Sequence, residues 1–285
     1  MSIQTYTDFG QNKGRYSTTT NALLEHIRAT EGGVYIYYTG GQESYRLDHG
    51  LIDFESTGDI GAYNALGYNF ISTVAHNGVQ NPTFSGRVVG DANAIHYATI
   101  EYRYDYTLSP EKNVFSLRPE VDYKIARTSK LITDVTGSTV YSGSTTSSDL
   151  VGQMLYRAGS GSQQLASYDG EVTHRLGAYG YIIGGIVTIE GATDNTNDSL
   201  GYRDITDDSF SITWTQDDWS PSEINDLTPL PNAIRGGDSG SPGWIWNETT
   251  QQYEYLAAGQ SGGGFFSQSR GATQWTTETM ESYNK

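Results

Sequence analysis

The segment 235–244 places a serine inside a glycine-rich turn, in the order Arg-Gly-Gly-Asp-Ser-Gly-Ser-Pro-Gly-Trp. A serine hydroxyl is a good nucleophile only when a base takes its proton and when the oxyanion that it creates is stabilised. Glycine permits a sharp turn and the close approach of a substrate carbonyl. In such a turn the N–H groups of Gly237 and Ser239 can point into one oxyanion hole. We therefore interpret Ser239 as a candidate nucleophile, although Gly, Ser and Asp also build ordinary turns.

A serine nucleophile requires an imidazole that accepts its proton. His76 follows the apolar and β-branched segment 68–75 and precedes the turn signal Asn77-Gly78. A side chain at the end of a buried strand is held rigidly at the edge of a cleft. We therefore expect His76 to be the base. The other four histidines lie on a predicted helix face or in polar segments: His26, His49, His96 and His174.

A carboxylate must orient the imidazole and stabilise its charged form. Asp122 opens the segment Asp-Tyr-Lys-Ile-Ala-Arg, which has apolar residues at alternate positions. The order His76, Asp122, Ser239 is that of chymotrypsin-type enzymes, and subtilisin and the α/β-hydrolases use other orders. Asp105 and Asp91 stay open as alternative acids.

These residues need a scaffold, and the pattern of the chain predicts one that is mostly β. Aromatic and β-branched residues are frequent, with 22 Tyr and 34 Gly among 285 residues. Short strands close to one another, separated by turn signals, indicate an all-β sandwich or barrel. The expected strands are 34–38, 68–75, 98–106, 122–127, 130–135, 151–157, 178–183, 186–190, 210–215, 244–246 and 253–257. One hairpin is expected at Gly184-Gly185 and a second around 247–252, between the last two strands. A weak helix is expected at 21–29 and a closing helix at 276–284.

Composition excludes several kinds of partner. The 17 Lys and Arg against 33 Asp and Glu give a net charge of −16, which disfavours nucleic acid or an anionic membrane surface. The absence of cysteine excludes disulfides and a thiol nucleophile. We see no signal peptide and no run long enough to span a bilayer. The aspartates between 194 and 208 lack the spacing of a calcium loop, and we expect neither a metal nor a cofactor.

Residues 142–149 form a Ser/Thr/Gly run that is typical of a linker. We expect one peptidase domain in two parts. Residues 1–141 would form an N-terminal β-barrel that carries the histidine and the aspartate, and residues 150–285 a C-terminal β-barrel that carries the serine.

Four segments, in this order, resemble the peptidase domain of the immunoglobulin A protease-like serine protease autotransporters. They are 6–14 (Tyr-Thr-Asp-Phe-Gly-Gln-Asn-Lys-Gly), 72–78 (Ser-Thr-Val-Ala-His-Asn-Gly), 122–133 (Asp-Tyr-Lys-Ile-Ala-Arg-Thr-Ser-Lys-Leu-Ile-Thr) and 237–242 (Gly-Asp-Ser-Gly-Ser-Pro). The first and third are the more specific, since other serine peptidases lack them.

The resemblance implies a chymotrypsin-like fold of two β-barrels with a cleft between them, to which the pattern of the tail adds a short C-terminal helix. It assigns His76, Asp122 and Ser239 as the triad, with the N–H groups of Gly237 and Ser239 as the oxyanion hole. It also implies a secreted or cell-surface location in a Gram-negative bacterium, and a β-helix and a membrane barrel that follow this domain. Two features depart from the family. The 46-residue gap between His76 and Asp122 is long, and Gly243-Trp244 replaces an apolar pair.

In chymotrypsin-like enzymes the residue six before the serine lies at the bottom of the S1 pocket. Here that residue is Ala233, beside Ile234, so we expect apolar or small P1 residues and not Arg or Lys. Gly259, Gln260 and Ser261 are candidate substrate-facing residues. The role of Asp238, which in trypsin-like zymogens pairs with a freed N-terminal amine, stays open.

The residues and the resemblance together predict a secreted serine endopeptidase that cleaves host or environmental proteins through an acyl-enzyme. The alternative is a catalytically silent adhesin or binding module on the same fold.

Overall fold

The computed structural model describes residues 27–30, 33–37, 44–74, 76–77, 82–84, 99–102, 115–117, 123–128, 130–133, 135–161, 163–166, 172–176, 183–194, 209–215, 230, 234, 236–260, 266–272, 276–277 and 280–281.

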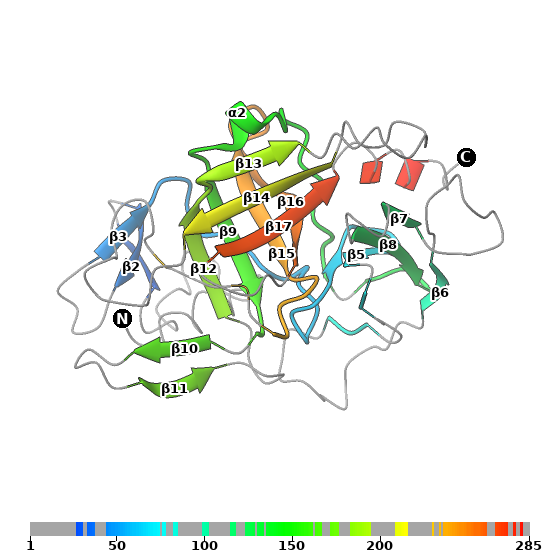
Figure 1. The fold of residues 1–285 in the computed structure, drawn as a ribbon, viewed down its shortest axis with the longest axis horizontal. Coiled ribbons are helices and arrows are strands. Elements are labelled where there is room, and N and C mark those ends of the chain that lie inside the picture. The colour runs from blue at the N-terminus through cyan, green and yellow to red at the C-terminus, as the bar shows by residue number, and fades with distance from the viewer. Residues whose placement is uncertain are drawn as a thin grey trace.

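Seven antiparallel strands form the larger sheet, in the order β12-β9-β15-β16-β17-β14-β13 (Figure 1). All of them follow residue 150. The hairpin predicted around residues 247–252 is confirmed as β15 and β16, which pair from Asn247↔Gln252 to Pro242↔Ala258. The strands are β9 (Met154–Gly159), β12 (Ile183–Thr188), β13 (Gly191–Asp194), β14 (Ser209–Thr215), β15 (Pro242–Asn247), β16 (Gln252–Gln260) and β17 (Phe266–Ala272).

A second sheet has five strands that all precede residue 141. Its order is β4-β5-β8-β6, and β7 also pairs with β8. β5 and β8 are antiparallel, with Thr73 opposite Lys124, and most residues of both strands are buried. The strands are β4 (Asn64–Ala65), β5 (Phe70–Thr73), β6 (Thr99–Tyr102), β7 (Phe115–Leu117) and β8 (Tyr123–Thr128).

Smaller elements surround these sheets. A three-stranded sheet comprises β1 (Ile27–Thr30), β2 (Gly33–Tyr37) and β3 (Ser44–Leu47), and a separate hairpin comprises β10 (Gln163–Ala166) and β11 (Val172–Leu176). The one named helix of the described residues is α2 (Ser147–Leu150). Residues 276–277 and 280–281 are helical, where the closing helix was predicted.

The largest hydrophobic core joins the two main sheets. Phe70 and Ile125 of the five-stranded sheet belong to the same buried cluster as Tyr156 and Trp244 of the seven-stranded sheet. Two buried tyrosines make polar contact within this core, since Tyr255 Oη donates to Tyr123 Oη at 3.5 Å. Burial of an aromatic residue removes 150–250 Å² from water, so this shared core holds the sheets in a defined relative position.

The segment that connects the two main sheets is bound to the β15–β16 hairpin. The N–H of Tyr255 donates to Thr139 O at 2.8 Å, and the carboxylate of Glu254 accepts from Ser142 N at 2.8 Å and from Asn247 Nδ2 at 2.8 Å. Burial alone would raise the pKa of Glu254, but these hydrogen bonds, with others from Thr250 and Gln252, hold that pKa below its ordinary value. The predicted linker 142–149 thus begins in direct contact with the C-terminal sheet, and the division into domains at this point stays a prediction.

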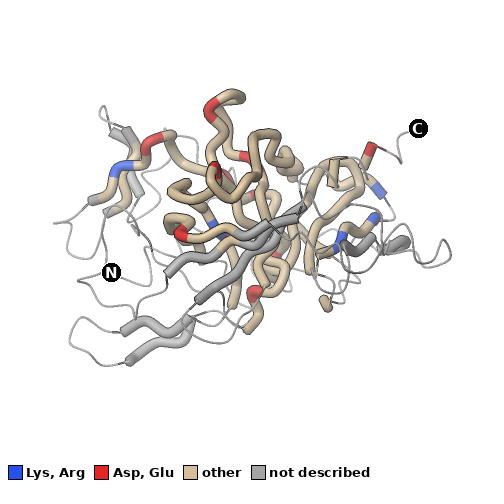
Figure 2. The backbone as a smooth tube through the Cα atoms, turned by 45° about the horizontal axis from the view of Figure 1, so that its top comes forward, with Lys and Arg blue, Asp and Glu red and all other residues tan. Residues whose placement is uncertain are grey.

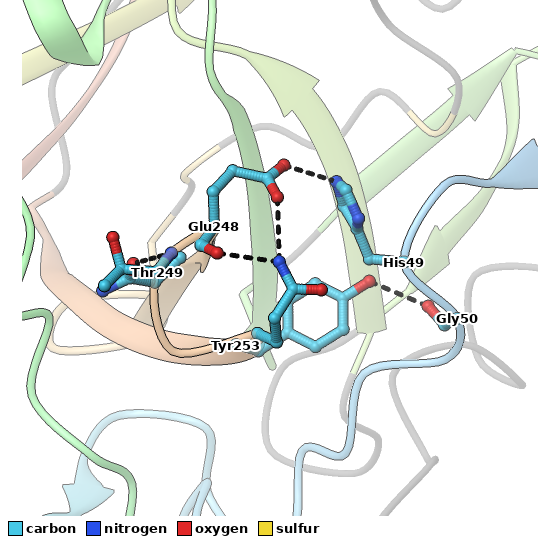
Figure 3. Close-up of polar contacts among 7 residues, drawn as sticks. His49, Gly50, Glu248, Thr249 and Tyr253 are labelled. Carbon is cyan, nitrogen blue, oxygen red and sulfur yellow. Dashed lines mark hydrogen bonds and ion pairs between the residues drawn. The ribbon is translucent and has the colours of Figure 1, made fainter.

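The segment that follows β3 also contacts the β15–β16 hairpin (Figure 3). His49 stacks on Trp246 with ring centroids 4.4 Å apart. Its Nε2 lies 3.7 Å from Glu248 Oε1 (Figure 3). The hydroxyl of Tyr253 donates to Gly50 O at 2.8 Å. This histidine therefore serves packing between elements.

The acidic residues of the described chain are dispersed over the tube and do not gather on one element (Figure 2).

Three local predictions were wrong. Gly184-Gly185 does not form a hairpin, because both glycines lie inside β12, opposite Ala158 and Arg157 of β9. Residues 130–133 and 135 are not a strand. The weak helix at 21–29 is wrong where the chain is described, because residues from Ile27 onward pair with β2 as β1. At Gly184-Gly185 pairing with the distant strand β9 overrode the local pattern, whereas at 27–30 the pairing is with β2, the next strand in the chain.

Candidate active site

The turn that contains Ser239 has a backbone that requires glycine. Gly237 has φ = 103° and Gly240 has φ = 86°, a region that other residues rarely adopt. The turn closes with Ser241 N donating to Asp238 O at 2.8 Å. Ser239 itself is half-buried. A Cβ at Gly240 would overlap Ala62 O and the hydroxyl of Thr73, so the serine turn packs directly against the five-stranded sheet.

The turn is also bound to strand β16. Gly240 N donates to Gly259 O at 2.7 Å, and Gly259 N donates to Ser241 O at 2.6 Å. A Cβ at Gly259 would lie 2.6 Å from Ser241 Oγ and 3.1 Å from Ile234 Cδ1. Two predicted substrate-binding residues, Gly259 and Ile234, therefore lie beside the serine turn.

Their surroundings differ. Ile234 is 2% exposed and belongs to the hydrophobic core of the C-terminal sheet, whereas Gln260 is half-buried at the end of β16. Ala233 and Ser261 lie outside the described residues. Contact of these residues with a substrate stays a prediction.

The carboxylate of Asp238 is enclosed by the end of β9. Asp238 is 1% exposed, and its Oδ1 accepts from Gly161 N at 2.7 Å. A Cβ at Gly159 or at Gly161 would overlap this carboxylate. Sequence reasoning missed these two glycines, and their only signal is the repeated glycine of the segment 159–162, Gly-Ser-Gly-Ser.

Arg157 places a buried positive charge next to this region. It is 1% exposed, and its Nη2 donates to Ser241 Oγ at 3.0 Å. Burial lowers the pKa of Arg157, and the charge of Asp238 acts in the opposite direction. Asp238 thus has an internal counter-charge, which sequence reasoning did not find because Arg157 lies 81 residues before it.

The segment that contains His76 also reaches Ser239. His76 is exposed, in a turn shortly after β5. Its neighbour Asn77 reaches the serine turn, because Nδ2 of Asn77 donates to the carbonyl oxygen of Ser239 at 2.5 Å. The structure therefore brings the residue beside the predicted base into contact with the predicted nucleophile.

The start of β8 joins the same group. The ammonium of Lys124 donates to the main-chain carbonyl of Asn77, and Lys124 is only 4% exposed. The predicted acid Asp122 precedes β8 by one residue in the sequence. It lies outside the described residues, as do its alternatives Asp105 and Asp91.

Comparison with known proteins identifies the family. The family described as immunoglobulin A1 protease matches residues 1–280. The chain belongs to the immunoglobulin A1 protease family. This confirms the resemblance inferred from the four motifs.

One protein similar in sequence to this chain is the adhesion and penetration protein autotransporter of Haemophilus influenzae. The two are 26% identical over 282 residues, which are 95% of this chain and 18% of the relative. The chain therefore spans about a fifth of the length of that protein.

Solved structures confirm the fold. The Hap adhesin of Haemophilus influenzae matches with a TM-score of 0.68 at 21% identity, over 98% of this chain and 27% of that one. The passenger domain of plasmid encoded toxin, an autotransporter enterotoxin from enteroaggregative Escherichia coli, matches with a TM-score of 0.60 at 16% identity, over 98% and 26%. The predicted all-β, chymotrypsin-like fold is thus confirmed for this autotransporter peptidase-like domain.

Metal-binding clusters and membrane-spanning helices are both absent from the described residues. In the described ranges, no three His, Cys, Asp or Glu side chains gather in a way that would hold a metal ion. None of the helices in those ranges has the length and apolar character that spanning a bilayer requires.

Proposed function

We propose that this domain is a serine endopeptidase in which Ser239 is the nucleophile, His76 the general base and acid, and Asp122 the carboxylate that orients the histidine. The observation that carries the proposal is the hydrogen bond from Asn77 Nδ2 to Ser239 O. It brings the segment of His76 to the candidate nucleophile across 162 residues of sequence. Membership of a protease family across residues 1–280 supports the same reaction class.

The chemistry follows from these roles. His76 takes the proton of Ser239 Oγ while Oγ bonds to the carbonyl carbon of a peptide substrate. The oxyanion accepts hydrogen bonds from the N–H groups of Gly237 and Ser239. The C–N bond then breaks, and His76 gives its proton to the leaving amine. Water, activated by the same histidine, releases the acid product from the acyl-enzyme and restores the serine.

The conformation of the serine turn supports the oxyanion hole. A glycine with positive φ next to residues of ordinary conformation directs successive N–H groups toward one point, which favours an anion. Gly237 has this conformation at φ = 103°. The carbonyl of Asp238 is held by Ser241 N, which fixes the peptide plane that carries the N–H of Ser239.

A fluorophosphonate probe tests the proposal, because it reacts with an activated serine and with little else. We expect the wild-type chain to be labelled and Ser239→Ala to be unlabelled. His76→Ala should be labelled 10²–10⁴-fold more slowly, the usual contribution of a general base. Ser148→Ala in α2 and His49→Ala are matched controls that should react like the wild type. A folded wild type that is not labelled would refute the peptidase proposal.

The identity of the acid has its own experiment. Asp122→Asn should slow labelling strongly, since loss of the orienting carboxylate leaves the histidine in the wrong tautomer. Asp105→Asn should leave the rate unchanged. If Asp105→Asn slows labelling strongly and Asp122→Asn does not, the orienting carboxylate is that of Asp105.

The second candidate function is adhesion without catalysis. It is favoured by the names of two similar proteins, an adhesion and penetration protein and an adhesin. We infer for either function a protein partner and a secreted or surface location on a Gram-negative bacterium, with a β-helix and a membrane barrel following in the complete protein. A folded chain that resists the probe but binds a host-cell surface would support adhesion.

A further inference from the structure

Asn77 occupies an unusual position between the two main sheets. It follows the predicted base in the sequence, and its side chain contacts the predicted nucleophile in space. Its main-chain N–H donates to Val74 O at 3.2 Å, and its main-chain carbonyl accepts from the ammonium of Lys124. The backbone and the side chain of Asn77 are therefore both held.

The side-chain amide has a defined orientation. Besides Ser239 O, its Nδ2 donates to Thr73 Oγ1 at 3.3 Å. The hydroxyl of Thr73 is fully buried and directs its own proton to Ala62 O at 2.7 Å, so it accepts from Asn77. Both N–H groups of the amide thus point at acceptors whose own positions are fixed.

The contact holds the peptide plane that follows the nucleophile. The carbonyl of Ser239 accepts from Asn77, and the N–H on the other side of the same peptide, that of Gly240, donates to Gly259 O at 2.7 Å. A peptide unit is planar. Two hydrogen bonds, one from Asn77 after β5 and one from Gly259 in β16, therefore fix its orientation, and with it the backbone of Ser239.

We propose that Asn77 is a positioning residue that sets the distance between His76 and Ser239, and that Lys124 holds Asn77 in place. This inference rests on the proposed function. Acyl transfer requires the reacting groups to lie within about 0.5 Å of the productive geometry, and a displacement of about 1 Å costs about 10²-fold in rate. One covalent bond joins Asn77 to His76 and one hydrogen bond joins it to Ser239, so Asn77 directly links the segments that carry the two groups.

The chain offers a matched control. Asn69 also donates its Nδ2 to a main-chain carbonyl, that of Thr128, at 3.1 Å. This bond lies within the five-stranded sheet region and makes no contact with Ser239. Asn69→Ala therefore removes the same kind of hydrogen bond from the same sheet without acting on the serine turn.

The test compares Asn77→Ala, Asn77→Asp and Asn69→Ala in fluorophosphonate labelling and in cleavage of a peptide substrate. We expect Asn77→Ala to lower the labelling rate and kcat by about 10²-fold with KM changed less than about threefold. Asn77→Asp keeps the shape but places a carboxylate oxygen against Ser239 O, so the loss should be at least as large. Asn69→Ala should lower Tm by a similar amount and leave the labelling rate within about threefold of the wild type.

Hydrogen exchange of residues 236–241 separates failure of this inference from failure of the proposed function. Faster exchange there in Asn77→Ala, but not in Asn69→Ala, supports a positioning contact even in a chain that the probe does not label. Wild-type exchange in Asn77→Ala, or labelling rates that follow Tm equally in all three variants, would overturn it. If Asn77→Ala does not fold, Asn77→Asp and Lys124→Met decide by the same two measurements.

Discussion

Removal of the buried charge of Arg157 is the perturbation whose effect the structure defines best. Arg157→Met keeps most of the side-chain volume but removes the hydrogen bond to Ser241 Oγ, which is 3.0 Å long. It also leaves the buried carboxylate of Asp238 without this counter-charge. A hydrogen bond from a charged group contributes about 1.5–3 kcal/mol, and breaking a buried charge pair by removing one partner costs about 3–5 kcal/mol.

We therefore expect Arg157→Met to lower the free energy of unfolding by about 3–5 kcal/mol, against a typical total of about 5–15 kcal/mol. Urea unfolding followed by tryptophan fluorescence measures this difference. Arg46→Met removes an exposed arginine of β3 and should change stability by less than about 0.5 kcal/mol. The fluorophosphonate rate of Arg157→Met should fall as well, because Asp238 is part of the serine turn.

The double variant Arg157→Met with Asp238→Asn decides between charge pairing and simple packing. With both charges removed, no uncompensated carboxylate is left. The double variant should then be about 0.5–3 kcal/mol more stable than the sum of the single variants implies. If the two changes in unfolding free energy add within about 0.5 kcal/mol, electrostatic coupling between Arg157 and Asp238 is refuted.

Three further predictions concern the same scaffold. Gly240→Ala introduces a Cβ into a residue with φ = 86° that packs against the facing sheet. Probe labelling of this variant should be lost. Its Tm should also fall further than that of Gly152→Ala, because Gly152 has φ = 90° but open space around it. Because the pKa of Glu254 is lowered in the folded state, the carboxylate adds stability that is present above pH 4.5, its ordinary value, and lost as the pH falls through the lowered value. Glu254→Gln should therefore unfold at a lower temperature than the wild type at pH 7, with the difference shrinking below pH 4.5, and an equal difference at pH 7 and pH 3 would contradict this. A peptide library should show small or apolar P1 residues, since Ala233 supplies no carboxylate at the predicted base of the pocket, and a preference for Arg or Lys would show that another acid reaches it.

The local sequence was a good guide wherever one segment defines its own conformation. The turn at Ser239 needs two glycines with positive φ, and the motif contains them. The hairpin after Trp246 was predicted from two apolar strands and a polar connection. Patterns that depend on a distant partner were less reliable. The Gly184-Gly185 pair predicts a turn, but both residues pair with β9 and form part of strand β12.

The candidate site divides in the same way. His76, Gly237 and Ser239 were identified from their own motifs, and the order of the predicted triad came from their succession in the chain. For Asn77 the sequence predicted only a position in the turn after His76, and it did not predict the contact with Ser239.

The amino-acid sequence by itself determined the all-β class, the family and the set of candidate catalytic residues. These depend on residue types and on short motifs within single segments of the chain. Tertiary structure alone decided that Asn77 meets Ser239, that Lys124 holds Asn77, and that Arg157 lies by Asp238. These partners are 162, 47 and 81 residues apart. The first meeting depends on how the two sheets pack over a shared core. The second depends on the pairing of β5 with β8, and the third on the pairing of β9 with β15. No local pattern encodes these pairings.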